Sequence, residues 1–100
     1  MNKLYVDDER NVPAGWDVAR SYDEAIEKLT NNKYDELSLD HDIASYDKTG
    51  KEKTGYDIAL WLANRKMVSN EYIPPKIDSH SANPIGRARI MGVITRYLND

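Results

Sequence analysis

The stretch that decides the fold is KLYVDD, residues 3–8. Its first four residues predict a short apolar β-strand, Lys3–Val6, which ends abruptly on the carboxylates of Asp7 and Asp8. The pattern returns at Tyr34–Leu39, which is followed by a further aspartate. Strands that end on ionisable side chains are typical of an α/β sheet with a binding site along one edge.

Three helices are predicted between and after the strands. SYDE, residues 21–24, is a capping box that opens the first helix. Thr54 caps the second, in which residues 58–62 are apolar on almost every side and are expected to be buried. The third starts at Asn83-Pro84, with asparagine as the N-cap and proline in the first turn, and runs to about Leu98. Its expected buried stripe is Ile85, Ala88, Met91, Ile94 and Leu98.

The other segments supply two more strands and one long loop. Trp16–Arg20 alternates apolar and polar residues and predicts a strand near a sheet edge. Pro74-Pro75 introduces a strand at Lys76–Ser79, and the polar residues 44–54 predict a mobile loop. Strands separated by helices imply right-handed crossovers. The sequence therefore predicts one α/β domain over residues 1–100, with a four-stranded parallel sheet ordered 2-1-3-4 and helices on both faces.

Composition restricts the class of protein. The chain of 100 residues is long enough for one core, and it has no cysteine, which excludes disulfides and thiolate sites and fits a reducing compartment. No apolar run approaches the roughly 20 residues that span a bilayer, and the N-terminus does not have the pattern of a signal peptide. We therefore expect a cytoplasmic protein with no membrane partner. The net charge of −3 argues against duplex nucleic acid as a partner but permits a small phosphorylated ligand.

Ionisable side chains gather where the predicted strands end. Parallel strands end at one edge of their sheet, so we expect one cleft to receive Asp7, Asp8, Asp40, His41, Asp42 and His80. Adjacent carboxylates repel one another, and a hard divalent cation, Mg²⁺ or Mn²⁺, relieves that repulsion. The expected metal ligands are Asp7, Asp8 and one of Asp40 or Asp42. The alternative is a set of polar turns, in which aspartate is common.

The two histidines are candidates for proton transfer, because imidazole exchanges a proton near neutral pH. In a mechanism without a metal, His41 and His80 would act as general base and general acid on opposite sides of a phosphorus atom. Asp40 and His41 are neighbours on an extended strand, so both can face the cleft only if the chain bends there. Which of the two faces the cleft stays open at this point.

Donors for an anion follow the last predicted strand. Ser81 and Asn83 offer neutral donors. The N-terminus of the helix that follows presents free N–H groups to a phosphate, and Gly86 would let the phosphate approach these groups closely. Arginine binds phosphate through two parallel hydrogen bonds, which makes Arg87 the preferred ligand and Arg10 a second one. The ordinary alternative is a turn capped by Asn83 and a solvated helix face.

Four short motifs resemble those of response-regulator receiver domains. Val6-Asp7-Asp8 resembles their acidic pair, Leu39-Asp40 their phosphoacceptor aspartate, and Ser81-Ala82 their small hydroxyl residue. Thr54–Leu60 resembles the glycine-led start of their third helix. The resemblance implies a receiver-like (flavodoxin-like) three-layer sandwich. The chain departs from ordinary receivers in lacking the fifth strand and its lysine.

Two longer motifs narrow the resemblance. LSLDHD, residues 37–42, and DSHSANPIG, residues 78–86, are similar to a divergent group, the cyclic-phosphate processing receiver domain, which is associated with phages and bacteria. Both motifs carry a histidine, His41 or His80, where ordinary receivers have none. The resemblance implies action on a cyclic phosphate derived from a nucleotide, ADP-ribose or an RNA end.

Three functions follow from these expectations. The first is phosphoesterase-type processing of a cyclic phosphate, with catalysis by His80, His41 and Asp40. The second is a binding module that sequesters a cyclic nucleotide or phosphate without turnover. The third, which the missing lysine disfavours, is a phosphoacceptor receiver domain modified at Asp40.

Overall fold

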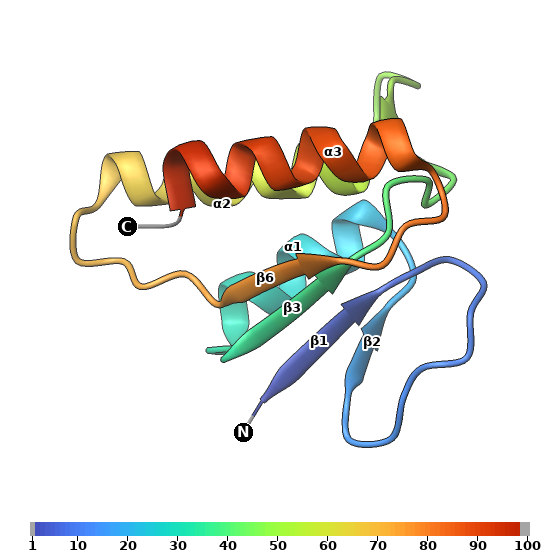
Figure 1. Ribbon diagram of the computed structural model, residues 1–100, viewed down its shortest axis with the longest axis horizontal. Coiled ribbons are helices and arrows are strands. Elements are labelled where there is room, and N and C mark those ends of the chain that lie inside the picture. Colours follow the sequence, from blue (N-terminus) through green and yellow to red (C-terminus); the bar gives the residue numbers. More distant parts are fainter. Residues whose placement is uncertain (1, 99–100) are drawn as a thin grey trace.

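The computed structural model describes residues 2–98 and has a four-stranded parallel sheet in the order β2-β1-β3-β6 (Figure 1). The strands are β1 (Lys3–Val6), β2 (Asp17–Ala19), β3 (Glu36–Leu39) and β6 (Lys76–Ser79). If these four strands are numbered 1 to 4 along the chain, their order in the sheet is 2-1-3-4, which confirms the predicted topology. The carboxyl ends of β1, β3 and β6 therefore lie side by side, which is the arrangement that a site at this edge requires.

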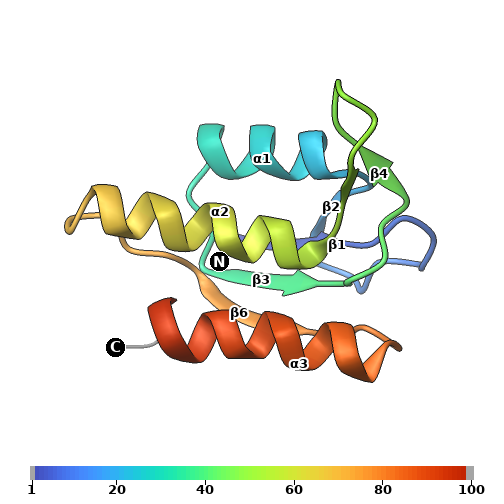
Figure 2. The same cartoon turned by 90° about the horizontal axis from the view of Figure 1, so that it is seen from above.

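Three helices complete the domain: α1 (Tyr22–Asn31), α2 (Gly55–Val68) and α3 (Pro84–Val93), which continues as a π-helix, η1 (Ile94–Leu98). Figure 2 shows α1 and α2 on one side of β3 and α3 on the other, in agreement with the receiver-like α/β fold. The Ser21 hydroxyl caps α1 by accepting from the Glu24 N–H, and the Asn83 side chain caps α3. None of the helices within residues 2–98 has the length and apolarity needed to cross a membrane.

The two faces of the sheet differ in burial. Paired residues of parallel strands lie on the same face, and the face toward α1 and α2 carries the core side chains Leu4, Val6, Leu37, Leu39 and Ile77. On the other face Lys76 and Asp78 are exposed and Tyr5 is half-buried, because α3 runs beyond the edge strand β6 and packs mainly against α2. This open face holds Tyr5, whose ring stacks on His80.

The segment predicted to be a mobile loop, residues 44–54, contains a β-hairpin, so that prediction was wrong. Its strands are β4 (Ser45–Tyr46) and β5 (Glu52–Lys53). The turn is held by one oxygen of Asp47, which accepts hydrogen bonds from the Thr49 N–H, the Thr49 hydroxyl and the Lys51 N–H. Gly50 supplies the positive φ of 83° that the turn needs.

The buried stripe of the last helix also differs from the expected one. Ile85 is 75% exposed and Ala88 is exposed, whereas the buried residues are Gly86, Ile90, Val93, Ile94 and Leu98. The helix is turned so that Gly86 lies against the His41 ring and Ile90 lies near Gly55. Contacts across two elements therefore decide which side faces inward, and the helix sequence alone did not reveal them.

Candidate functional site

A pocket of about 450 Å³ opens at the carboxyl edge of the sheet, where the loops after β1, β3 and β6 meet the β4–β5 hairpin. Its wall is acidic, with the carboxylates of Asp7, Asp8, Glu9, Asp40, Asp42 and Glu52. Arg10 is the one cationic residue in the wall as the structure describes it. An anion can enter such a pocket only if its charge is balanced, by a bound cation or by donors on the pocket wall.

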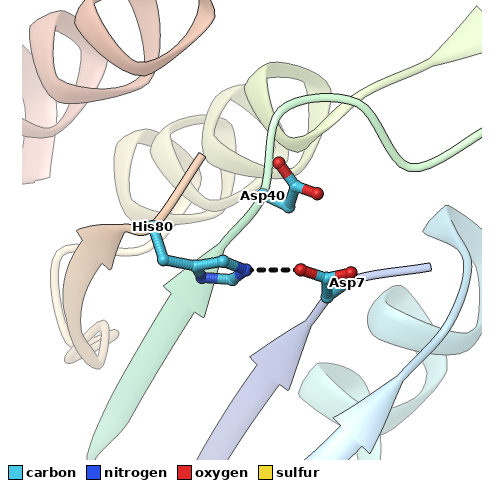
Figure 3. Close-up of side chains that lie close together, drawn as sticks. All are labelled: Asp7, Asp40 and His80. Carbon is cyan, nitrogen blue, oxygen red and sulfur yellow. Dashed lines mark hydrogen bonds and ion pairs between the residues drawn. The ribbon is translucent and has the colours of Figure 1, made fainter. Parts of the chain in front are cut away.

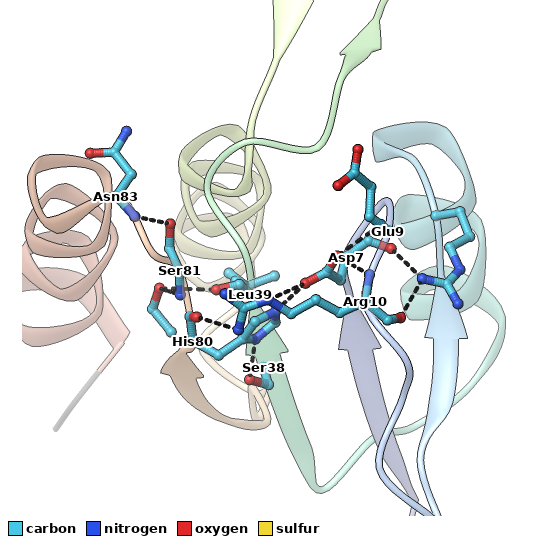
Figure 4. A network of polar contacts seen from close by, with 10 residues as sticks. Asp7, Glu9, Arg10, Ser38, Leu39, His80, Ser81 and Asn83 are labelled. Carbon is cyan, nitrogen blue, oxygen red and sulfur yellow. Dashed lines mark hydrogen bonds and ion pairs between the residues drawn. The ribbon is translucent and has the colours of Figure 1, made fainter.

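Asp7 anchors the loop that follows β1. Its side chain is 1% exposed, and Oδ1 accepts hydrogen bonds from the N–H groups of Glu9, at 2.9 Å, and Arg10, at 2.8 Å (Figure 4). Its Oδ2 lies 3.0 Å from Nε2 of His80 and 3.8 Å from Nε of Arg10. Burial raises the pKa of Asp7, but these two N–H groups and His80 outweigh it and hold the pKa below its ordinary 3.8. Asp7 is therefore an ionised anchor with few free lone pairs.

His80 is held on both ring nitrogens. Its Nδ1 lies 2.7 Å from the Ser38 hydroxyl (Figure 4), and its ring stacks on Tyr5 with centroids 4.0 Å apart. An ionised Asp7 can only accept, so Nε2 of His80 carries the proton in that contact, and in the neutral ring Nδ1 accepts from Ser38. The side chain is 15% exposed and is not part of the pocket wall. His80 is thus a packed residue below the pocket, directly after the end of β6.

Ser38 is the functional candidate that the sequence analysis missed. It lies in β3 opposite Tyr5 of β1, so both side chains are on the open face, next to His80. A serine between two leucines, Leu37 and Leu39, was the available signal. Its meaning depends on the strand register, which the sequence did not fix.

Asp40 completes a cluster with Asp7 and His80. Each of the three offers one possible metal-ligand atom, and these atoms lie within 4.8 Å of one another (Figure 3). Within residues 2–98, the Asp40 carboxylate accepts no hydrogen bond and forms no ion pair. A Cβ at Gly55 would collide with the Asp40 carbonyl oxygen, so the close approach of α2 to this strand end requires glycine. Asp40 lines the pocket and His41 does not, so Asp40 is the residue of this pair that faces it.

His41 points away from the pocket and into the start of α3. A Cβ on Gly86 would collide with its ring, so this glycine makes room for His41 rather than for a phosphate. Nδ1 of His41 lies 2.9 Å from Asp42, whereas its Nε2 is buried and has no hydrogen-bond partner within the described part of the chain. The His41 ring holds the pKa of Asp42 below 3.8. This placement makes His41 a residue that supports the loop after β3.

Most of the other predicted metal and phosphate ligands line the pocket but do not belong to the cluster of Asp7, Asp40 and His80. Asp8 and Asp42 line the pocket but are outside the group formed with Asp40. Ser81 and Asn83 also line it; the Asn83 amide caps α3 and reaches Asp42, as the ordinary alternative expected. Arg10 lines the pocket and is half-exposed.

Arg87, the preferred phosphate ligand, is directed elsewhere. Its Nε donates to the Ser79 carbonyl oxygen at 3.0 Å, and the residue is not part of the pocket wall. The hydrogen bond ties α3 to the end of β6. In this structure Arg10 is therefore better placed than Arg87 to meet an anion in the pocket.

A second pocket, of about 380 Å³, lies at the opposite edge of the sheet, between the ends of α1 and α2. Its central cation is Arg65, which donates to the Leu29 carbonyl oxygen and packs on the ring of Tyr72 at 4.4 Å. These contacts occupy the guanidinium, and the pocket lacks a cluster like that of Asp40 within residues 2–98.

The donor set at the acidic pocket fits a divalent cation. Asp7, Asp40 and His80 supply two carboxylates and one imidazole. Such a mixed set suits Mn²⁺ better than Mg²⁺, which prefers oxygen ligands. Two of the three side chains are committed to each other by hydrogen bonding, so a metal would have to displace the proton of His80.

A family model described as "Cyclic-phosphate processing Receiver domain" matches residues 2–96. No curated protein and no solved structure matches the chain. The match covers every strand and helix that contributes to the acidic pocket.

Proposed function

The chain belongs to the cyclic-phosphate processing receiver domain family, and we propose that its acidic pocket hydrolyses a cyclic phosphodiester to a phosphomonoester. The observation that carries this proposal is the free carboxylate of Asp40, which lies beside the hydrogen-bonded pair of Asp7 and His80. A carboxylate without hydrogen bonds at a pocket is available for chemistry, whereas one that is saturated is not.

The proposed reaction is an attack of water on phosphorus that opens the ring. One P–O bond forms to the water oxygen, and one P–O bond to a ring oxygen breaks. Asp40 accepts the proton of the attacking water, and Nε2 of His80, which gives up its hydrogen bond to Asp7, returns a proton to the leaving oxygen. Asp7 and Ser38 fix the His80 ring, and Arg10 with Ser81 supplies donors for the phosphate oxygens. A positioned acid or base contributes about 10²–10⁴-fold to the rate.

A divalent metal, Mn²⁺ or Mg²⁺, is the alternative form of this proposal and would replace proton transfer by Asp40 and His80, because an atom that coordinates a metal cannot hold a proton as well. The cluster of Asp7, Asp40 and His80 would hold it, with Asp8 or Asp42 as further carboxylates on the wall. When bound, such an ion polarises a phosphate oxygen and lowers the pKa of water. The excess of carboxylates over cations in the wall supports a need for added positive charge when an anion binds.

A second candidate function is binding without turnover. The observation in its favour is that both ring nitrogens of His80 already have partners, so the ring must give up one of them before it transfers a proton. A pocket that holds a cyclic phosphate through Arg10 and Ser81 would sequester its ligand without this rearrangement.

The test is ³¹P NMR of the protein with 2′,3′-cyclic nucleotides, with and without Mn²⁺ or Mg²⁺. Hydrolysis converts the cyclic phosphate signal into a monoester signal, and Asp40→Asn should abolish the conversion. Binding without conversion would favour the sequestering module. A phosphorylated Asp40 formed from a small phosphodonor such as acetyl phosphate would favour the phosphoacceptor function instead.

A further inference from the structure

The β4–β5 hairpin forms one side of the acidic pocket. It carries two side chains to which the proposed hydrolysis assigns no role. Tyr46 and Glu52 both line the pocket, and both are exposed, Tyr46 at 62%. They are direct partners across the antiparallel pair, so they project from the same face of the hairpin. An aromatic ring and a carboxylate thus stand side by side at the pocket.

The opposite face of the hairpin fixes this arrangement. Ser45 is buried, and its hydroxyl accepts a hydrogen bond from the Tyr22 N–H at 3.1 Å. Lys53, which pairs with Ser45, lies over the Tyr22 ring at 5.5 Å. The hairpin is therefore attached to the start of α1 on one face and presents Tyr46 and Glu52 on the other. A preorganised pair loses little freedom when a ligand binds.

We propose that Tyr46 and Glu52 bind the nucleobase of the ligand, so that the pocket takes a nucleoside cyclic phosphate with an amino-bearing base, guanine above all. This inference rests on the proposed function, because it places the phosphate of the same ligand at Asp40. An exposed aromatic ring offers a stacking surface for any base. The pocket volume of about 450 Å³ is within the range of about 300–1,000 Å³ that small-molecule sites occupy.

The negative charge of Glu52 restricts which ligand groups can bind beside the Tyr46 ring. Glu52 is an acceptor only, and it shares the pocket with five other carboxylates, so the part of the ligand that meets it must be neutral or cationic and must donate hydrogen bonds. A phosphate or a second anionic group is excluded from this end. Guanine presents two donors, its ring N–H and its amino group, on one edge, and these match the two oxygens of one carboxylate. Uracil offers a single donor.

The test measures the affinities of three probes by calorimetry, in the presence of Mn²⁺. The probes are guanosine 2′,3′-cyclic phosphate, uridine 2′,3′-cyclic phosphate and the 2′,3′-cyclic phosphate of methyl riboside, which has no base. The protein should bind the guanosine probe most tightly and the probe without a base most weakly. Tyr46→Ala should weaken binding of the guanosine probe by roughly 5- to 150-fold, the effect of losing one stacked base. It should leave the probe without a base unchanged.

Four further variants separate base recognition from folding and charge. Tyr46→Phe keeps the ring and should bind the guanosine probe as the wild type does. Glu52→Gln should reduce the preference for guanosine over uridine by roughly tenfold, since it removes one charged hydrogen-bond acceptor. The matched controls are Tyr97→Ala and Glu27→Gln, which remove an exposed tyrosine and an exposed carboxylate outside the pocket and should change nothing.

The outcomes distinguish this inference from the proposed hydrolysis. If all three probes bind equally, or if Tyr46→Ala binds the guanosine probe like the wild type, base recognition by the hairpin is wrong even if every probe is hydrolysed. If the guanosine probe binds in a manner that depends on Tyr46 but is not hydrolysed, base recognition stands and the hydrolysis fails. If no probe binds, both are overturned.

Discussion

The ends of β1 and β3 place the same side chain, an aspartate, in opposite situations. Asp7, after β1, is buried and accepts hydrogen bonds from two backbone N–H groups and from His80. Asp40, after the neighbouring strand β3, lies at the same pocket with no hydrogen bond to its carboxylate from residues 2–98. A saturated carboxylate stabilises the fold and a free one is available to a ligand, so stability and reactivity should depend on different aspartates.

The largest effect on turnover is expected for Asp40→Asn. It removes the proposed proton acceptor and should lower kcat by about 10²–10⁴-fold. It removes no hydrogen bond, so the free energy of unfolding should stay within about 0.5 kcal/mol of the wild type. The measurements are ³¹P NMR turnover and urea unfolding of the same sample. A variant that unfolds easily but still turns over the substrate would reverse the roles assigned to the two aspartates.

Asp7→Ala should have the complementary effect. It leaves the N–H groups of Glu9 and Arg10 without their acceptor and the His80 ring without its partner, at a cost of about 3 kcal/mol in the free energy of unfolding. Urea unfolding measures this loss, with Asp8→Ala as the control at the adjacent, partly exposed position. Equal stability of the two variants would mean that the network around Asp7 contributes nothing.

Ser38→Ala tests whether the hydrogen bond that holds His80 contributes to both stability and turnover. Losing the hydroxyl at Nδ1 should cost about 1–2 kcal/mol of stability and reduce turnover by roughly tenfold, because the ring is no longer fixed from both sides. ¹⁵N NMR of the histidine ring should report a changed tautomer balance. Ser79→Ala is the matched control, since this buried hydroxyl donates to the Leu39 carbonyl oxygen rather than to a histidine. A tautomer balance identical in wild type and Ser38→Ala would rule out a positioning role.

The smallest expected effect is the acid dependence of stability. The pKa of Asp7 is lowered in the folded protein, so the unfolded chain binds a proton first as the pH falls. Its contribution is therefore complete above about pH 4 and is lost as the pH falls through the lowered pKa. Unfolding free energies measured between pH 6 and pH 2 should fall less steeply at the acid end in Asp7→Asn than in the wild type. Parallel curves for the two proteins would show that Asp7 is not the group responsible.

The sequence predicted the sheet and the meeting of its strand ends because both follow from local patterns. Short apolar strands alternating with capped helices imply a parallel sheet, and its carboxyl edge then collects the residues that follow each strand. Asp7, Asp40 and His80 were brought together on that basis, and the structure places them together.

What the sequence did not predict depends on contacts between elements. The choice between Asp40 and His41 depends on where the strand ends and on the approach of Gly55 and Gly86, whose missing side chains make room for one residue each. The hairpin around Gly50 depends on a turn held by one aspartate oxygen, which looks like any polar loop in the sequence.

The most direct test is to find where the ligand's phosphorus lies in a crystal structure. The crystals are grown with Mn²⁺ and a non-hydrolysable guanosine 2′,3′-cyclic phosphorothioate, and the anomalous signals of manganese and sulfur locate the metal and the phosphorothioate group. We expect both signals in the acidic pocket, beside Asp40, with the base against Tyr46. Signals in the pocket around Arg65, at the opposite edge of the sheet, would contradict this expectation.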